Sequence, residues 1–507
     1  MRYSTGVLIL NAIALCECST KVVIGYFPNW LSTVYPVENI PYQNYTHINY
    51  AFAILNDPNQ LPSFSDQGAV ESSLPQLVRL AHGNHTKVSL SVGGWTGSQK
   101  FSSMVSRPES RKNFIQWNLD FIQKYNTDGV DIDWEYPARQ GAGCNEFADN
   151  DTDNLLLLLR ELRTALDVQF PEQHKEISMA VYVEPFLKSG SPMTNLSSFV
   201  PYFDYVNLMT YDINGAWGET TGPNAPFQAV EGKGAPYSFV KSIQDWKAAG
   251  VPSHKITAGL AFYGRSIIAK QDMLQDLSNQ FQPSEQTAPK GDEEDDFWQD
   301  PFCSQEPASY SGIWKWASIR QQGLLKDDLI TADKGWYRQW DNVTKTPWLF
   351  NPATNQYLSY DDPASLQIKI EHAVCQDLAG VMVWDIHQDN GELLETVNNI
   401  YTLSCPSSDN SSTINKPSKS NPIRSSSVMH TTSSRTNKPS KVAHTSSVAR
   451  STSSTTKTNK KCSKAGEMKC SQSGKSPEWL TCDSGHWVTR HCAQGLLCYD
   501  GPGKRNR

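Results

Sequence analysis

The chain has 507 residues, with 45 Lys and Arg against 52 Asp and Glu, which gives a formal net charge of −7. This mild acidity excludes a general nucleic-acid-binding protein, which would be basic. Only 38% of the residues are apolar, yet the chain contains 15 Trp. We therefore expect a packed, aromatic-rich body joined to long polar segments.

The N-terminus has the pattern of a secretory signal peptide. Arg2 precedes an apolar stretch over residues 6–15, and small residues follow around Cys16 and Ser19. We expect residues 1–19 to be removed and the protein to be secreted; a buried first strand is the alternative interpretation. No apolar run approaches the ~18–20 residues of a membrane span, so we expect no membrane partner.

Secretion predicts disulfides and glycosylation. The body of the chain has an even number of cysteines, whose pairing the sequence does not reveal: Cys144, Cys303, Cys375 and Cys405. Asn-x-Ser/Thr triplets, which we expect in exposed loops, begin at Asn44, Asn84, Asn150, Asn195, Asn342 and Asn410.

Apolar β-branched runs alternate with longer amphipathic segments across residues 20–405. Helical patterns include Asn154–Phe170 and Tyr237–Ala249. Alternating strands and helices indicate parallel βαβ units, and eight strands predict an α/β fold of the (β/α)₈ TIM-barrel type. The eight predicted strands are Val22–Phe27, Thr46–Ala53, Lys87–Val92, Gly129–Tyr136, Glu176–Val183, Asp204–Tyr211, Lys255–Tyr263 and Ala379–Ile386.

The fourth of these strands carries three acidic residues at alternate positions. Because alternate side chains of a strand share a face, Asp131, Asp133 and Glu135 are expected to point into the barrel lumen. Three close carboxyls cannot all ionise cheaply, so the pKa of part of the cluster should rise. A carboxylic acid that donates a proton near neutral pH is the consequence. Spacing alone also allows a site for a hard cation.

The interval between Tyr263 and Ala379 is too long for one crossover helix. It is polar, aromatic and rich in turn residues, so we predict an inserted α+β subdomain over about residues 266–350. The acidic run at 291–296 and the nearby Glu219 are expected to be solvated loop.

The C-terminal part of the chain changes composition twice. Residues 406–461 are dominated by Ser and Thr, which predicts a disordered, O-glycosylated linker. Its basic residues allow binding to a polyanion, but a solvated linker is the simpler interpretation. Residues 462–507 form a short Cys-rich module that needs disulfide staples. Its cysteines lack the paired spacing of a zinc site and are odd in number: Cys462, Cys470, Cys482, Cys492 and Cys498.

At this point the sequence resembles family 18 of the glycoside hydrolases, the chitinases and their relatives. The resemblance covers most of residues 22–403 and follows the family's motif order. The motifs are Asp128-Gly-Val-Asp-Ile-Asp-Trp-Glu135, Ser91-Val-Gly-Gly-Trp95, Met209-Thr-Tyr-Asp212, Phe262-Tyr-Gly-Arg265 and Val383-Trp-Asp385. The inserted subdomain lies where bacterial-type members carry one.

The resemblance implies a retaining, substrate-assisted mechanism, which is known for this family. Glu135 would be the general acid and base. Asp133 would orient the acetamido group of the substrate and share a proton with Asp131. Tyr211 would donate a hydrogen bond to the acetamido oxygen. No cofactor and no metal are implied.

The resemblance also implies a set of substrate-binding residues. A pyranose has an apolar face that an indole ring can cover. Trp384 would lie under the cleaved sugar, and Trp95 and Trp217 would stack sugars on the leaving-group side, although Trp217 is alternatively a loop residue covering core. The full set is Tyr26, Ser91, Trp95, Met209, Asp212, Trp217, Arg265 and Trp384.

The Cys-rich tail resembles small chitin-binding modules of fungal chitinases. By that likeness an exposed ring of Trp479, Trp487 or Tyr499 would stack on chitin, or Trp487 would be the packing centre. Taken together, these features predict a secreted, monomeric chitinase whose partners are chitin and N-acetylglucosamine oligosaccharides. The alternatives are a chitinase-like lectin that lacks the acid and an endo-β-N-acetylglucosaminidase.

Overall fold

The computed structural model describes residues 21–57 and 59–405, together with the backbone of four strands between Lys457 and His491. The chain divides into two compact units, Met1–Ser412 and Thr413–Arg507. The predicted signal peptide at residues 1–19 and the predicted linker up to residue 456 lie outside the described residues.

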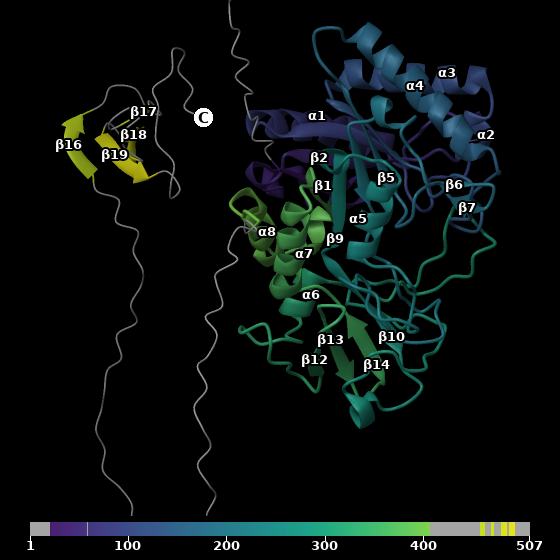
Figure 1. The fold of residues 1–507 in the computed structure, drawn as a ribbon, viewed down its shortest axis with the longest axis vertical. Helices are drawn as coiled ribbons and strands as arrows, with labels where there is room; N and C mark the ends of the chain where they lie inside the picture. The colour runs from purple at the N-terminus through teal and green to yellow at the C-terminus, as the bar shows by residue number, and fades with distance from the viewer. Residues whose placement is uncertain are drawn as a thin grey trace, which may run out of the picture. The chain divides into compact units, whose positions relative to one another are not determined.

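Eight parallel strands of the first unit close into a barrel, which confirms the predicted fold (Figure 1). Neighbouring strands follow the order β1-β15-β9-β8-β5-β4-β3-β2. Each predicted run overlaps one barrel strand. The strands are β1 Val22–Pro28, β2 His47–Ala53, β3 Lys87–Gly93, β4 Gly129–Asp133, β5 Glu176–Val181, β8 Tyr205–Leu208, β9 Ile256–Ala261 and β15 Gly380–Trp384.

Helices surround the barrel, and side chains cap the starts of α1, α5 and α7. Asp362 and Ser365 form a capping box at the start of α7, with Pro363 in the first turn. Among the described residues no helix is long and apolar enough to cross a membrane. The helices are α1 Gln67–Gly83, α2 Phe101–Val105, α3 Pro108–Tyr125, α4 Asp151–Gln169, α5 Phe239–Ala248, α6 Trp316–Gln321, α7 Pro363–Cys375 and α8 Glu392–Val397.

The core has two layers that the strand alternation separates. Val23 and Phe27 of β1 belong to the large cluster between barrel and helices. Ile24 and Tyr26 of the same strand belong to a smaller cluster that fills the lumen. Since successive side chains of a strand point to opposite faces, one sequence run supplies both layers.

The long interval between β9 and β15 folds into a five-stranded antiparallel sheet in the order β11-β10-β14-β13-β12. In Figure 1 its labelled strands lie away from α1, α3 and α4. The sheet runs from Tyr263 to Ser359, wider than the predicted 266–350, because β10 begins directly after β9 and pairs with β14. The strands are β10 Tyr263–Ile268, β11 Ile313–Lys315, β12 Tyr337–Asp341, β13 Thr346–Asn351 and β14 Gln356–Ser359. A separate two-stranded sheet pairs β6 Leu187–Lys188 with β7 Ser191–Pro192.

The interpretation of residues 291–296 as solvated loop is wrong for two of its acids. Asp292 is buried and accepts hydrogen bonds from the backbone N–H of Lys315 at 3.1 Å and from its Nζ at 3.0 Å. Asp295 accepts from three backbone N–H groups, at Gly291, Ser311 and Gly312. Asp292 and Asp295 therefore hold the backbone of residues 291–315 in place, although the sequence of this acidic run is typical of an exposed loop.

Two disulfides join the four body cysteines, which confirms the expectation of disulfides. Cys144 pairs with Cys303, which lies 159 residues away in the inserted segment. Cys375 at the end of α7 pairs with Cys405. Only the tertiary structure reveals this pairing, because the separation of two cysteines in the sequence does not predict whether they are bonded.

The second unit contains a four-stranded antiparallel sheet in the order β16-β19-β18-β17. Its first strand begins at Lys457, five residues before the predicted start of the module at Cys462. The strands are β16 Lys457–Lys461, β17 Met468–Cys470, β18 Glu478–Asp483 and β19 His486–His491.

Candidate active site

The acidic residues of β4 lie inside the barrel. Asp131 and Asp133 lie on the strand, and Glu135 follows two residues after its end. All three are buried. Trp134 points the other way, and its ring stacks on Phe101 of α2 with 5.3 Å between ring centroids. The alternation predicted from the sequence therefore holds past the end of the strand.

Asp131 lies deepest and is surrounded by hydrogen-bond donors from four other strands. Its Oδ2 accepts from the hydroxyls of Tyr26 at 2.8 Å and Ser91 at 2.7 Å. Its Oδ1 accepts from Ser178 at 2.5 Å and from Asn207 at 3.2 Å. Burial raises the pKa of Asp131, and these donors counteract the rise.

Sequence reasoning found Tyr26 and Ser91 but missed Ser178 and Asn207. Both missed residues are single polar side chains in the middle of apolar strands, β5 and β8. This pattern could have identified both residues as site residues, because a polar side chain buried in the barrel lumen needs a hydrogen-bond partner.

Asp133 is the least satisfied member of the cluster. Its Oδ1 is buried and has no hydrogen-bond partner. Burial raises the pKa of Asp133 well above its usual range, and the charges of Glu135 and Asp131 raise it further. A buried carboxyl oxygen without a donor costs free energy, so this atom is a position where a ligand N–H would be bound.

The end of β3 packs tightly on the backbone of β4. The backbone oxygen of Asp133 accepts from the N–H of Gly94 at 2.8 Å. A Cβ at Gly93, whose φ is +118°, would lie 2.1 Å from that oxygen. Gly93 is therefore required for the close approach of the two strands.

Glu135 lies at the mouth of the barrel. Burial raises its pKa to about 7; the Tyr136 hydroxyl acts in the opposite direction, and the Asp212 charge adds to the rise. Its backbone N–H donates to the Ser98 hydroxyl at 3.1 Å, and its backbone oxygen accepts from the Asn145 amide at 3.0 Å. None of Tyr136, Ser98 and Asn145 was predicted as a site residue from the sequence.

Tyr211 follows β8 and lies beside the acids. Its hydroxyl donates to Sδ of Met382 at 3.5 Å. Burial raises its pKa well above the usual range, and the charge of Asp133 is the next largest cause. Met209, two residues earlier, is half-buried against the lumen cluster.

Asp212 connects the barrel to the inserted sheet. Its Oδ1 accepts from the Tyr263 hydroxyl and from Nε of Arg265, both at 2.6 Å. The Arg265 guanidinium lies over the Trp217 ring, 5.1 Å from its centroid. Trp217 is 56% exposed, so it is not a loop aromatic covering core. Arg265 belongs to β10 of the insertion, and its contacts bring it to the barrel mouth.

Aromatic rings line another part of the mouth. Trp384 ends β15 and stacks on Phe52, with 5.6 Å between centroids and 14° between planes. Phe52 in turn stacks on Trp30 at 6.0 Å, and Tyr26 lies 5.7 Å from Trp384. Trp30 was not predicted; it lies in a short 3₁₀ helix, Asn29–Leu31, directly after β1 and outside every motif. The stacked rings of Trp30, Phe52 and Trp384 offer apolar faces at the mouth, beside the buried acids.

Trp95 follows β3 and is 49% exposed. Its backbone oxygen accepts from the same Asn145 amide that bonds Glu135, at 3.0 Å. In the second unit, Trp479 lies on β18 and Trp487 on β19, whereas Tyr499 lies outside the described residues. The suggested roles of these three stay predictions.

The acidic cluster at the barrel mouth can carry out acid–base chemistry. A carboxyl with a pKa near 7 can donate and accept a proton at neutral pH. Two further buried carboxyls, Asp131 and Asp133, lie beside it, and burial raises the pKa of each. Within the described part of the chain, no group of three or more His, Cys, Asp or Glu is placed to hold a metal ion.

Comparison with known proteins gives a consistent picture. The family model of glycosyl hydrolases family 18 matches residues 22–389. A protein of Moniliophthora roreri named "chitinase-like effector" is 34% identical over 401 residues, covering 76% of this chain and 95% of its own. The crystal structure of a chitinase from Rhizomucor miehei has a TM-score of 0.68 and 32% identity, covering 75% of this chain and all of that one. A group IV chitinase of Ostrinia furnacalis, solved with allosamidin, gives a TM-score of 0.62 and 29% identity, covering 75% of this chain and 99% of that one.

Proposed function

Because the chain belongs to family 18 of the glycosyl hydrolases, we propose that it is a secreted, monomeric chitinase that hydrolyses β-1,4 linkages of N-acetylglucosamine polymers. One observation carries the proposal. Glu135, with a pKa near 7, lies two residues from Asp133, whose buried Oδ1 lacks a partner. Glu135 can donate a proton to the bond that is cleaved. Oδ1 of Asp133 is free to accept a hydrogen bond from the N–H of an acetamido group, so the pair suits a sugar that carries such a group.

The proposed reaction begins with proton transfer from Glu135 to the glycosidic oxygen, whose bond to C1 then breaks. The carbonyl oxygen of the substrate's own acetamido group attacks C1 and gives an oxazolinium ion. Glu135, now a carboxylate, takes a proton from water, which attacks C1 and opens the ring. Two displacements at C1 leave the product with retained configuration.

The other acids and Tyr211 hold the acetamido group in this scheme. Asp133 accepts a hydrogen bond from its N–H through the oxygen that lacks a partner. Asp131, with its four donors, shares a proton with Asp133. Tyr211 turns its hydroxyl from Met382 to the acetamido oxygen and holds that oxygen in position to attack C1.

The remaining residues bind and orient the polymer. Trp384 lies under the sugar that is cleaved, and Trp95 and Trp217 stack sugars on the leaving-group side. Tyr26 and Ser91 act through Asp131. Met209, Asp212 and Arg265 shape the cleft wall, as their positions at the mouth support.

The second unit is proposed to be a chitin-binding module that begins at β16. Trp479, Trp487 or Tyr499 would supply the ring that stacks on the polymer. Deleting residues 457–507 should reduce retention on insoluble chitin and spare hydrolysis of soluble oligomers. Unchanged retention would remove the binding role.

Product analysis on defined N-acetylglucosamine oligomers tests the proposal. The protein should release shorter oligomers of retained anomeric configuration, and Glu135→Gln should lower kcat by at least about 10²-fold, because an amide cannot donate the proton. Oligomer binding by this variant should persist. Glu109→Gln on the exposed first turn of α3 is the matched control and should be fully active. Normal turnover by Glu135→Gln, or cleavage of fully deacetylated polymer, would contradict the mechanism.

A second candidate function is binding of chitin oligomers without hydrolysis. We consider it because the 34% identical relative is named "chitinase-like effector". The presence of Glu135, Asp133 and Asp131 favours hydrolysis over this alternative. The two functions separate in one measurement, because a binding protein would bind the oligomers and release no product.

A further inference from the structure

Asn145 lies in the loop that follows β4 and donates two hydrogen bonds from one amide nitrogen. Nδ2 donates to the backbone oxygen of Glu135 and to the backbone oxygen of Trp95, each at 3.0 Å. Asn145 is only 5% exposed, so both bonds are shielded from water. The proposed acid and a proposed sugar platform, which follow different strands, therefore share a single donor.

The two acceptors determine which way the amide of Asn145 faces. A backbone oxygen accepts hydrogen bonds and cannot donate, so the amide nitrogen, not Oδ1, must face both of them. Oδ1 is buried and has no hydrogen-bond partner among the described residues. A buried oxygen without a donor costs stability, so packing alone does not account for an amide at this position.

The backbone of Glu135 is held on both sides. Its N–H donates to the Ser98 hydroxyl at 3.1 Å, and that hydroxyl donates to the backbone oxygen of Gly94 at 2.8 Å. Its backbone oxygen accepts from Asn145 and lies against Gly141, where a Cβ would come within 1.9 Å of it. Because the peptide groups on both sides of its Cα are held, the Glu135 carboxyl can move only by rotations within its own side chain.

The loop that carries Trp95 is held from the same side. Beside the bond from Asn145 to the backbone oxygen of Trp95, the backbone N–H of Glu146 donates to the backbone oxygen of Gln99 at 3.1 Å. The ring of Trp95 is 49% exposed, so contacts to its backbone are what fix its place.

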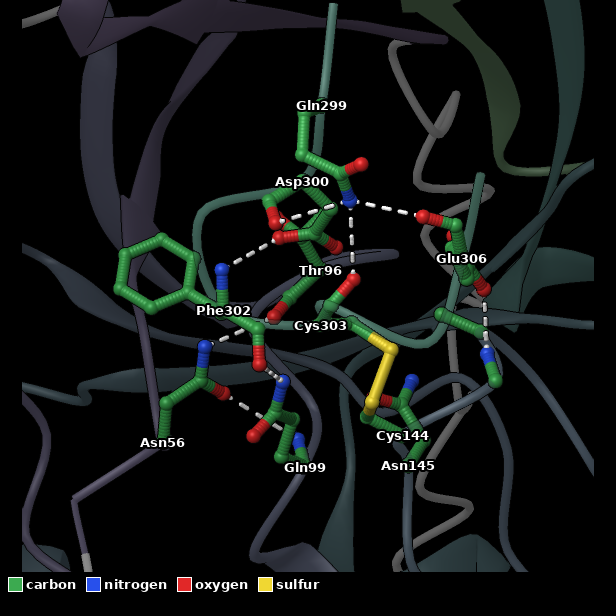
Figure 2. The surroundings of a disulfide bond; sticks show 12 residues. Asn56, Thr96, Gln99, Cys144, Asn145, Gln299, Asp300, Phe302, Cys303 and Glu306 are labelled. Atoms are coloured by element: carbon green, nitrogen blue, oxygen red, sulfur yellow. Dashed lines mark hydrogen bonds between the residues drawn. A yellow bond between two sulfur atoms is a disulfide. The ribbon is translucent and has the colours of Figure 1, made fainter. Parts of the chain in front are cut away.

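A hairpin of the inserted segment is bonded to the residue before Asn145 (Figure 2). Trp298 and Ser309 exchange both backbone N–H···O bonds at 3.0 Å, which defines the hairpin. Cys303 at its tip forms the disulfide with Cys144. The loop that carries Asn145 is therefore joined covalently to a part of the chain outside the barrel.

Further bonds tie the tip of this hairpin to both loops. Nε2 of Gln99 donates to the backbone oxygen of Phe302 at 2.7 Å. The carboxylate of Glu306 accepts the backbone N–H of Gly143. The position of Asn145 thus depends on the inserted segment as well as on the barrel.

We propose that Asn145 is a positioning residue that fixes Glu135 and Trp95 relative to each other. The Cys144–Cys303 disulfide holds Asn145 in place for this role. The inference rests on the proposed function, in which the acid protonates the oxygen of the leaving sugar while the platform stacks on that sugar. Since a misplacement of about 1 Å can cost about a hundredfold in rate, one shared donor keeps the two groups at the separation that the reaction needs.

The first test compares two leaving groups in the full chain. A sugar leaves only when its oxygen is protonated, whereas the 2,4-dinitrophenyl glycoside of the N-acetylglucosamine dimer releases a stable anion and has no leaving sugar to stack. Asn145→Ala should lower kcat/KM on the N-acetylglucosamine tetramer about tenfold or more, and on the dinitrophenyl substrate less than about threefold. Asn145→Asp turns an oxygen toward two backbone oxygens and should lower the tetramer value at least as much.

The matched control is Asn118→Ala. Asn118 is 1% exposed, its Nδ2 donates to the backbone oxygen of Phe114 at 2.9 Å, and its Oδ1 also lacks a partner, but it lies on α3. This variant should lose a similar amount of melting temperature and keep the ratio of the two kcat/KM values. Cys144→Ser with Cys303→Ser should change the ratio in the same direction as Asn145→Ala, and it serves if the Asn145 variants do not fold.

The second test needs no turnover and measures binding of the N-acetylglucosamine hexamer in the Glu135→Gln background. Trp95→Ala should weaken binding less when Asn145→Ala is already present, because loss of the shared donor has displaced the ring. Additive effects of these two substitutions overturn the inference. Equal losses of kcat/KM on both substrates also overturn it, because they would show a loss of folded protein.

The two tests separate this inference from the proposed function. If the unmodified protein binds the hexamer and releases no product, the proposed hydrolysis fails, and the binding measurements alone support or overturn the role of Asn145. If it hydrolyses the tetramer and Asn145→Ala keeps the ratio of the two kcat/KM values, the inference fails while the proposed function stands.

Discussion

The hydroxyl of Tyr26 donates a 2.8 Å hydrogen bond to Oδ2 of Asp131, although 105 residues separate the two in the sequence. Both side chains are almost fully buried in the barrel lumen. Tyr26 therefore acts on the acidic cluster from below, through Asp131, and its hydroxyl does not face the open mouth.

Replacing Tyr26 with Phe should lower kcat by about ten- to a hundredfold and change KM little, because a hydrogen bond to a charged group is worth about 1.5–3 kcal/mol. Loss of this donor raises the pKa of Asp131 and disturbs the proton that it shares with Asp133. Tyr42→Phe is the matched control, since its buried hydroxyl donates to the backbone of Val37 far from the site. The control should lose similar stability and keep kcat. Equal kcat in both variants would contradict the role.

The activity should fall as pH rises through about 7. Glu135 must carry a proton to act as the acid, and burial raises its pKa to about 7. The charge of Asp212 contributes to that rise, so Asp212→Asn should move the alkaline limb of the kcat/KM profile to lower pH. Asp245→Asn, on the exposed face of α5, should leave the limb in place. An unmoved limb in Asp212→Asn would argue against Glu135 as the titrating group.

Glu176 should contribute stability that is lost in acid. Burial alone would raise its pKa, but His47 and Lys87 lower it to about 2. A depressed pKa stabilises the fold above the unfolded value of about 4.3, and that gain disappears as pH falls toward 2. Glu176→Gln should therefore cost about 3 kcal/mol at pH 7 and much less near pH 2. Melting temperatures across this range check it, and a gap that persists in acid would contradict it.

The buried pair of Lys369 and Asp361 should be costly to break on one side. Nζ lies 2.6 Å from Oδ2, and both side chains are almost fully buried. Lys369→Met leaves a buried carboxyl without its partner and should cost about 3–5 kcal/mol in the free energy of unfolding. Adding Asp361→Leu should recover much of this loss.

The matched control for this pair is Lys241→Met. Its partner Asp245 lies at the same 2.6 Å, but the pair is exposed. Such a pair is worth about 0.5 kcal/mol or less. Denaturant unfolding of the unmodified protein, Lys369→Met, the double variant with Asp361→Leu, and Lys241→Met checks the difference. Similar losses of unfolding free energy in Lys369→Met and Lys241→Met would show that burial is not decisive here.

The motif residues of the barrel were readable in the sequence because their chemistry is local. The alternation around β4 places Asp131, Asp133 and Glu135 on one face wherever the strand lies, and apolar runs with helical patterns between them predict the barrel. Ser178 and Asn207 were missed, although each is one polar residue within an apolar strand. Asn145 and Trp30 had no such signal.

The sequence by itself determined the barrel, the acidic strand and the resemblance to one enzyme family, since strand period and residue spacing are properties of neighbours in the chain. Only the tertiary structure decided that Cys144 pairs with Cys303, that Asp292 and Asp295 fix a hairpin, and that one Asn145 amide holds both Glu135 and Trp95. These contacts join segments up to 159 residues apart. Nothing in local propensity encodes such a distance, because it follows from how the insertion folds back onto the mouth.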